Sequence, residues 1–145
     1  MAGVERDGGC LCGAVRFKVS GPPLRVGICH CQDCRRASGS FFTPFGVWPM
    51  SAYEGSGQMN TFARRSFCPQ CGSHIAWLRD NEAEIMLGSL DMAPSDLIPD
   101  YELWVPRREN WLMALPWAEQ HCLGRSNLPV IAFRPSIHDE SAETS

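Results

Sequence analysis

Short alternating runs of apolar and polar residues recur along the chain and predict strands rather than long helices. In residues 14–19 the apolar side chains occupy every second position, and Arg16 and Lys18 stand between them, the pattern of a half-buried strand. Residues 41–48 are rich in aromatic and β-branched side chains, and Pro44 would place this strand at an edge or a bulge. The remaining candidate strands are residues 59–67, 84–87 and 101–105.

Glycine and proline interrupt these runs throughout the chain. The 13 glycines and 11 prolines are scattered and act against long helices. A turn is expected at residues 55–57, a short helical turn from Pro94, and a brief helix capped by Asn110 that Pro116 would end. The fold class that follows is mainly β, with short strands, many turns and short helical segments.

The length favours a single domain. A chain of 145 residues buries roughly 68–70% of the surface that it exposes when unfolded, so it has room for a core. One domain is expected over residues 1–135. Residues 136–145 are acidic and nearly free of apolar groups, which predicts a disordered tail.

The charge and hydropathy patterns exclude several classes of partner. A formal net charge of −3 gives no general attraction to nucleic acid or to anionic membranes. No apolar run approaches the ~20 residues that span a bilayer, and the polar first residues lack the apolar region of a secretory signal. We therefore expect a cytoplasmic protein with a small-molecule partner; the oligomeric state stays unknown at this point.

Eight cysteines in a reducing compartment favour metal binding over a disulfide framework. Cys10 and Cys12 are flanked by glycines that let the backbone curl, and Cys68-Pro-Gln-Cys71-Gly72 is typical of a zinc knuckle. The two pairs together supply four thiolates, a closed tetrahedral set for a structural zinc. The alternative is that one pair is a redox dithiol.

The segment Cys29-His-Cys-Gln-Asp-Cys34 offers three sulfurs and no adjacent fourth ligand. Zinc sites with three protein ligands keep a fourth position for water or substrate, as catalytic sites do. Cys29, Cys31 and Cys34 are therefore a candidate catalytic zinc site, and two zinc ions per chain are expected. The alternatives are that His30 or the distant Cys122 closes the site, or that Cys122 is an ordinary buried thiol.

Other side chains could serve the same site. Arg35 and Arg36 follow the triplet directly, and they could lower the thiol pKa values and bind the carboxylates of an anionic substrate, or form only a solvated pair. His74 could approach either metal or be a packed or surface residue. Five aromatic residues either line a pocket or belong to the core: Trp48, Tyr101, Trp104, Trp111 and Trp117.

The ordered cysteine clusters resemble the glutathione-dependent formaldehyde-activating enzyme (GFA) family, whose domains have the Mss4-like fold. The resemblance covers roughly residues 8 to 120 and rests on four segments: Gly9-Cys-Leu-Cys-Gly13, Cys29-His-Cys-Gln-Asp-Cys-Arg35 with Ser38-Gly39-Ser40, Phe67-Cys-Pro-Gln-Cys-Gly-Ser73 and Gly88-Ser-Leu-Asp91. It implies several small coiled antiparallel sheets and a structural zinc on the two cysteine pairs. It also implies a second zinc on the triplet, with an open position where glutathione acts.

The activity that the resemblance implies is a carbon–sulfur lyase reaction, the joining of glutathione as co-substrate with formaldehyde to give S-hydroxymethylglutathione, or the reverse. Asp33, inside the triplet loop, and Asp91 are candidate proton carriers, or else turn or capping residues. Two other functions stay open. One is a non-catalytic zinc module for a protein partner, and the other is a hydrolase that uses zinc-bound water without any thiol.

Overall fold

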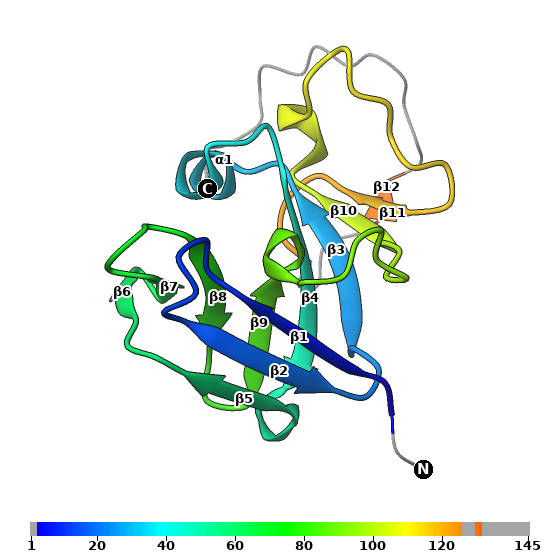
Figure 1. The fold of residues 1–145 in the computed structure, drawn as a ribbon. Coiled ribbons are helices and arrows are strands. Elements are labelled where there is room, and N and C mark those ends of the chain that lie inside the picture. Colours follow the sequence, from blue (N-terminus) through cyan, green and yellow to red (C-terminus); the bar gives the residue numbers. More distant parts are fainter. Residues whose placement is uncertain (1–2, 126–129, 132–145) are drawn as a thin grey trace. The chain divides into compact units, whose positions relative to one another are not determined.

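The computed structural model describes residues 3–125 and 130–131, which are mainly β, as the sequence predicts (Figure 1). They divide into two compact units. Unit 1 contains the residues up to Arg25 together with Phe45–Leu97, and unit 2 contains Val26–Pro44 and the residues from Ile98 onward. The predicted tail at 136–145 lies outside the described residues. None of the helices among the described residues has the length and apolar content needed to cross a membrane.

Unit 1 contains a small antiparallel sheet of β1 (Glu5–Gly9), β2 (Arg16–Ser20) and β5 (Tyr53–Ser56), in the order β1-β2-β5 (Figure 1). The alternation that predicted β2 is confirmed, because Phe17 and Val19 are buried and Arg16 is exposed. Gly57 has a φ of 89°, so the turn falls after β5, whereas the expected turn at 55–57 included strand residues.

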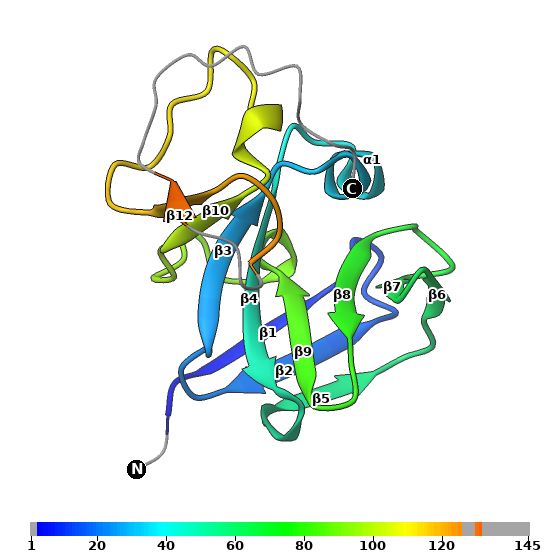
Figure 2. The ribbon, with the colours of Figure 1, turned by 180° about the vertical axis from the view of Figure 1, so that it is seen from behind.

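The second sheet of unit 1 is also antiparallel, with strand order β4-β9-β8-β7-β6 (Figure 2). Its pairing with β9 begins at Phe45, directly after Pro44, which has no N–H to donate. The elements are β4 (Thr43–Pro49), η1 (Met50–Ala52), β6 (Asn60–Phe62), β7 (Arg65–Phe67), β8 (His74–Leu78), β9 (Glu82–Met86) and η2 (Leu87–Ser89).

One apolar cluster forms the core of unit 1 and joins the inner faces of both sheets. Trp48 is completely buried, and its indole N–H donates to the carbonyl oxygen of Gly21 at 3.0 Å. Trp48 is therefore a core residue with its polar group satisfied. Its neighbours in the cluster include Val15, Phe17, Val19, Ile75, Ala83, Ile85 and the sulfur-bearing Cys10 and Cys68.

Unit 2 is built around β10 (Tyr101–Leu103), which pairs in parallel with β3 (Arg25–Cys29) and with β11 (Glu119–His121). β12 (Val130–Ile131) pairs antiparallel with β11. The unit also holds α1 (Gln32–Ser38) and η3 (Val105–Arg107). The parallel pairs add to the antiparallel sheets that the family resemblance implies. They are possible here because long connections separate the paired strands in the sequence.

Several expected elements are different in the structure. Residues 59–67 form a hairpin rather than one strand, because Ala63 and Arg64 adopt positive φ angles of 48° and 65° and reverse the chain. The expected helical segments after Pro94 and Asn110 are wrong, since residues 94–97 and 110–115 form bends and turns. The sequence pattern also missed α1, which has no buried residues and therefore no apolar period to detect.

Candidate metal centres

The structure brings Cys10, Cys12, Cys68 and Cys71 together in unit 1. All four sulfurs lie within 4.8 Å of one another. The Cys12 sulfur is 3.5 Å from that of Cys10 and 3.7 Å from that of Cys68. Two thiolates on one tetrahedral zinc, with Zn–S bonds of ~2.3 Å, stand about 3.8 Å apart. The cluster therefore has the donor type, number and spacing to hold one such ion.

Two tight turns aim these sulfurs inward. After β1, the Cys10 carbonyl accepts from the N–H of Gly13, whose φ is 84°. In the knuckle, the N–H of Gly72 donates to the Cys68 carbonyl at 2.8 Å, with a φ of 79° at Gly72. Both turns need the left-handed backbone that glycine adopts without strain, as the sequence indicates.

Local N–H and hydroxyl groups favour a thiolate at part of this cluster. Hydrogen bonds from the hydroxyl and the backbone of Ser73, and from the backbone of Cys12, lower the pKa of Cys71 to about 5. The backbone of Ala14 favours a Cys12 thiolate, but burial and the neighbouring sulfurs outweigh it and raise the pKa of Cys12 to about 12. Four crowded sulfurs thus cannot all be ionised unless a cation compensates their charge.

The triplet Cys29, Cys31 and Cys34 gathers in unit 2. Its three sulfurs also lie within 4.8 Å of one another. Cys29 ends β3, and Cys31 caps α1 by accepting at its sulfur from the N–H of Cys34 at 3.3 Å. The neighbouring sulfurs of Cys31 and Cys34, together with burial, raise the pKa of Cys29 strongly. A divalent cation would offset this repulsion, so the triplet can also hold a metal.

No fourth side chain joins the triplet among the described residues, because the group contains no histidine, carboxylate or further cysteine atom. His30 is fully buried, and its Nε2 contacts Glu102 at 2.8 Å. Cys122 and His74 belong to neither cysteine cluster, and burial lowers the pKa of His74.

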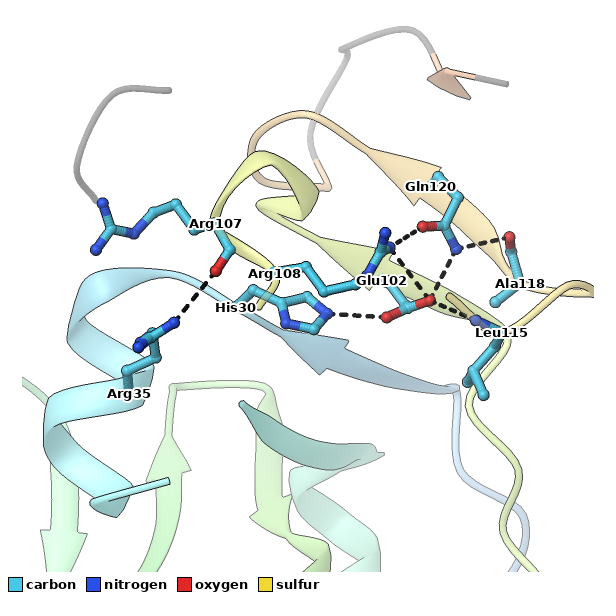
Figure 3. Close-up of polar contacts among 8 residues, drawn as sticks. All are labelled: His30, Arg35, Glu102, Arg107, Arg108, Leu115, Ala118 and Gln120. Carbon is cyan, nitrogen blue, oxygen red and sulfur yellow. Dashed lines mark hydrogen bonds and ion pairs between the residues drawn. The ribbon is translucent and has the colours of Figure 1, made fainter. Parts of the chain in front are cut away.

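A basic pocket lies beside α1 in unit 2. Its volume is about 450 Å³, and its lining consists of Gln32, Arg35, Arg36, Gly39, Ser40, Phe41 and Arg107. Arg35 is held in place by two contacts. It pairs with Glu109 at 2.7 Å, and it donates to the Arg107 carbonyl at 3.2 Å (Figure 3). Arg36 is exposed. Because three guanidinium groups meet one carboxylate, the pocket has an excess of positive charge.

The two candidate proton carriers have different surroundings. Asp33 is exposed in the first turn of α1, between two triplet cysteines. Asp91 forms an ion pair with Arg16 through both carboxylate oxygens, and this pairing holds its pKa below the usual range. The carboxylate of Asp91 is therefore engaged by Arg16.

Sequence reasoning missed the buried carboxylate of Glu102, which lies on β10 with 2% of its surface exposed. Figure 3 shows its contacts with His30, Arg108, Leu115 and Gln120. Burial opposes ionisation, but hydrogen bonds from these partners and the charge of Arg108 outweigh it and lower the pKa of Glu102 to about 2. Nothing in the local sequence indicates this cluster, because its members come from distant segments.

The aromatic residues divide between core and surface. Trp48 and Tyr101 are buried, as the core interpretation expects. Trp111 and Trp117 are 64% and 63% exposed. Trp111 packs edge-on against Phe41 of the basic pocket, with ring centroids 5.2 Å apart.

Comparison with known proteins agrees with the cysteine pattern. The family model described as glutathione-dependent formaldehyde-activating enzyme matches residues 5–107. An uncharacterized lyase of Schizosaccharomyces pombe is 32% identical over 82 residues, which cover 53% of this chain and 60% of that protein. The crystal structure of a Rhodobacter sphaeroides protein is similar with a TM-score of 0.49 and 23% identity, over 64% of this chain and 97% of that one. Since the family model covers well over half of its length, the chain belongs to the glutathione-dependent formaldehyde-activating enzyme family.

Proposed function

We propose that this protein is a zinc-dependent carbon–sulfur lyase that acts on the adduct of an aldehyde with glutathione or another small thiol. The observation that carries this proposal is the triplet, where three sulfurs converge and no fourth protein ligand joins them within the described chain. Family membership and the lyase name of the yeast relative support the same reaction class. The four-cysteine cluster would hold a second, structural zinc.

The reaction adds a thiol across an aldehyde. A sulfur–carbon bond forms, the carbonyl π electrons move to oxygen, and the thiol proton ends on that oxygen; the reverse reaction breaks the carbon–sulfur bond. Zinc held by Cys29, Cys31 and Cys34 would supply a Lewis acid that favours an ionised thiol and a polarised carbonyl. Asp33, exposed beside the triplet cysteines, would carry the proton between substrate and solvent.

The basic pocket would bind the anionic part of the substrate. Glutathione carries two carboxylates, and arginine binds carboxylates through paired, charge-assisted hydrogen bonds. Arg36 is the exposed guanidinium in the lining, whereas Arg35 is occupied by Glu109. Arg36→Ala should therefore raise the KM for glutathione several-fold, with Arg36→Lys as the charge-retaining control. Arg35 would mainly position the pocket wall.

The proposal is tested by counting zinc per chain in zinc-loaded protein, with glutathione absent and present. The proposal expects about two zinc ions, in line with one tetrahedral site per cluster, and a change in coordination when glutathione is added. Cys31→Ser should remove one ion and abolish glutathione-dependent consumption of formaldehyde. Cys122→Ser is the matched control, because it removes a thiol outside both clusters and should leave the zinc content and turnover unchanged.

A second candidate function, a non-catalytic zinc module for a protein partner, is favoured by exposed apolar side chains in unit 2. Trp111, Met113 and Trp117 are each more than 60% exposed. This function predicts that glutathione leaves the zinc coordination unchanged and that no aldehyde is consumed with or without thiol. Aldehyde consumption or ester hydrolysis without any thiol would instead support the hydrolase alternative.

A further inference from the structure

A buried carboxylate in unit 2 faces a backbone N–H, an amide, a guanidinium and an imidazole. Glu102 Oε1 lies 2.8 Å from His30 Nε2 (Figure 3). Oε2 accepts from the Leu115 N–H and from the Gln120 amide, both at 2.9 Å, and lies 3.4 Å from the Arg108 guanidinium. Such a set of partners requires a side chain that offers only acceptors, which an ionised carboxylate does and an amide does not.

The donors are themselves fixed. Gln120 is 3% exposed, and its amide also donates to the Ala118 carbonyl at 3.1 Å (Figure 3). Its side-chain oxygen accepts from Arg108. Glu102 therefore cannot exchange its partners for water without breaking a buried network, and leaving buried polar groups unpaired is costly.

The hydrogen-bond network of Glu102 reaches the segment that carries the triplet cysteines. His30 stands between Cys29 and Cys31 in the sequence, and its side chain is completely buried. Its backbone N–H donates to the Leu103 carbonyl at 3.0 Å, and Leu103 is also the register partner of Cys29 in the β3–β10 pair. Strand β10 thus contacts the Cys29–Cys31 segment in two ways: through backbone pairing with β3 and His30, and through the side-chain contact between Glu102 and His30.

We propose that Glu102 is a positioning residue for the triplet metal centre, and that it acts through His30. The contact holds the imidazole, and with it the backbone between two ligands, so that the sulfurs of Cys29 and Cys31 stay aimed at one point. This inference rests on the proposed function only in taking the triplet as a metal centre. Outer-shell partners of this kind commonly change metal affinity by 10- to 100-fold.

The test measures the metal affinity of each centre in full-length Glu102→Gln. Glutamine has nearly the same shape, but its amide group places a donor opposite the donors of the network. In chelator competition, zinc affinity at the triplet should fall about 10- to 100-fold, while affinity at the four-cysteine cluster stays unchanged. NMR of the cadmium-substituted protein separates the two centres, because three- and four-sulfur sites give distinct resonances. The resonance of the four-cysteine site also shows that the variant is folded.

Two variants of His30 test the route. In His30→Gln an amide N–H replaces the imidazole N–H toward Glu102, so the triplet of this variant should retain most of the wild-type zinc affinity. His30→Leu removes the donor and should lose affinity as Glu102→Gln does. If Glu102→Gln does not fold, this pair alone decides: equal affinity in both variants would overturn the proposal.

Glu84→Gln is the matched control, since Glu84 is a largely buried carboxylate of unit 1 that belongs to neither cysteine cluster. It should leave both affinities unchanged. Wild-type affinity at the triplet of Glu102→Gln would overturn the positioning role and leave the proposed function standing. A wild-type triplet that takes up no metal would instead overturn the proposed function itself, and the positioning role with it.

Discussion

Two buried carboxylates, Glu102 and Glu84, face different groups, and replacing each with glutamine should change the free energy of unfolding in opposite directions. Glu102 is surrounded by donors that hold its pKa at about 2 instead of the usual 4.5. Glu84 has 12% of its side chain exposed and contacts Arg79 only at 3.5 Å. Burial dominates there and raises the pKa of Glu84 to about 7.

The magnitudes follow from these pKa values. Each difference from 4.5 is about 2.5 pH units, and at about 1.4 kcal/mol per unit it amounts to about 3 kcal/mol. The stabilisation from ionised Glu102 is present above pH 4.5 and is lost as the pH falls through about 2. The cost of ionising Glu84 has the opposite sign: it is absent below pH 4.5 and complete above about 7.

The assay is urea-induced unfolding at about pH 8, with free zinc buffered at one concentration. Because zinc stabilises each variant according to its own zinc affinity, the linkage contribution is calculated from the chelator-competition affinities and subtracted before the variants are compared. Glu102→Gln should lower the free energy of unfolding by about 3 kcal/mol, and Glu84→Gln should raise it by up to about 3 kcal/mol. The stabilising effect of Glu84→Gln should shrink as the pH falls from 7 toward 4.5. Equal destabilisation by both substitutions would refute the reasoning from donor surroundings and burial.

Three further substitutions probe the cysteine clusters. Gly72→Ala should destabilise the protein by about 1 kcal/mol in urea unfolding, because φ is 79° there although no atom crowds a Cβ; no loss would contradict the left-handed turn. Ser73→Ala removes the hydroxyl 3.2 Å from the Cys71 sulfur and should speed zinc release to a chelator several-fold, with Ser73→Thr as the control that keeps the hydroxyl. Cys31→Ser keeps an oxygen acceptor for the Cys34 N–H, so its free energy of unfolding should be about 1 kcal/mol higher than that of Cys31→Ala. Both variants should lose the triplet metal, and identical stability of the two would argue against the cap.

The cysteine clusters illustrate how far local sequence reaches. The spacing of Cys29, Cys31 and Cys34 places three sulfurs within one short segment, so they can converge without long-range contacts. The knuckle from Cys68 is similar, because Gly72 specifies its turn. The contact between the knuckle and Cys12 is long-range, because Cys12 and Cys68 are 56 positions apart. The sequence indicated this contact only because two separate cysteine pairs together supply the four ligands of a zinc site.

The helix α1 shows where periodicity fails. It is a seven-residue helix with no buried side chain, so no apolar repeat marks it. Its caps did carry a signal, since Cys31 accepts from the first turn and Gly39 ends the helix with a φ of 66°. The residue pattern also predicted one strand at 59–67. The structure has a hairpin there, because two non-glycine residues, Ala63 and Arg64, adopt positive φ angles.

The sequence by itself determined the β class, the grouping of the cysteines and the family, because each depends on residues close together or on motifs in a fixed order. The tertiary structure decided the role of Glu102. Alternation along residues 101–105 marks this glutamate only as polar, and polar positions of a strand normally face water. Strand β10 lies between two parallel neighbours, and His30, 72 positions away, faces the carboxylate in a buried network. Such burial is set by long-range pairing, which no local pattern contains.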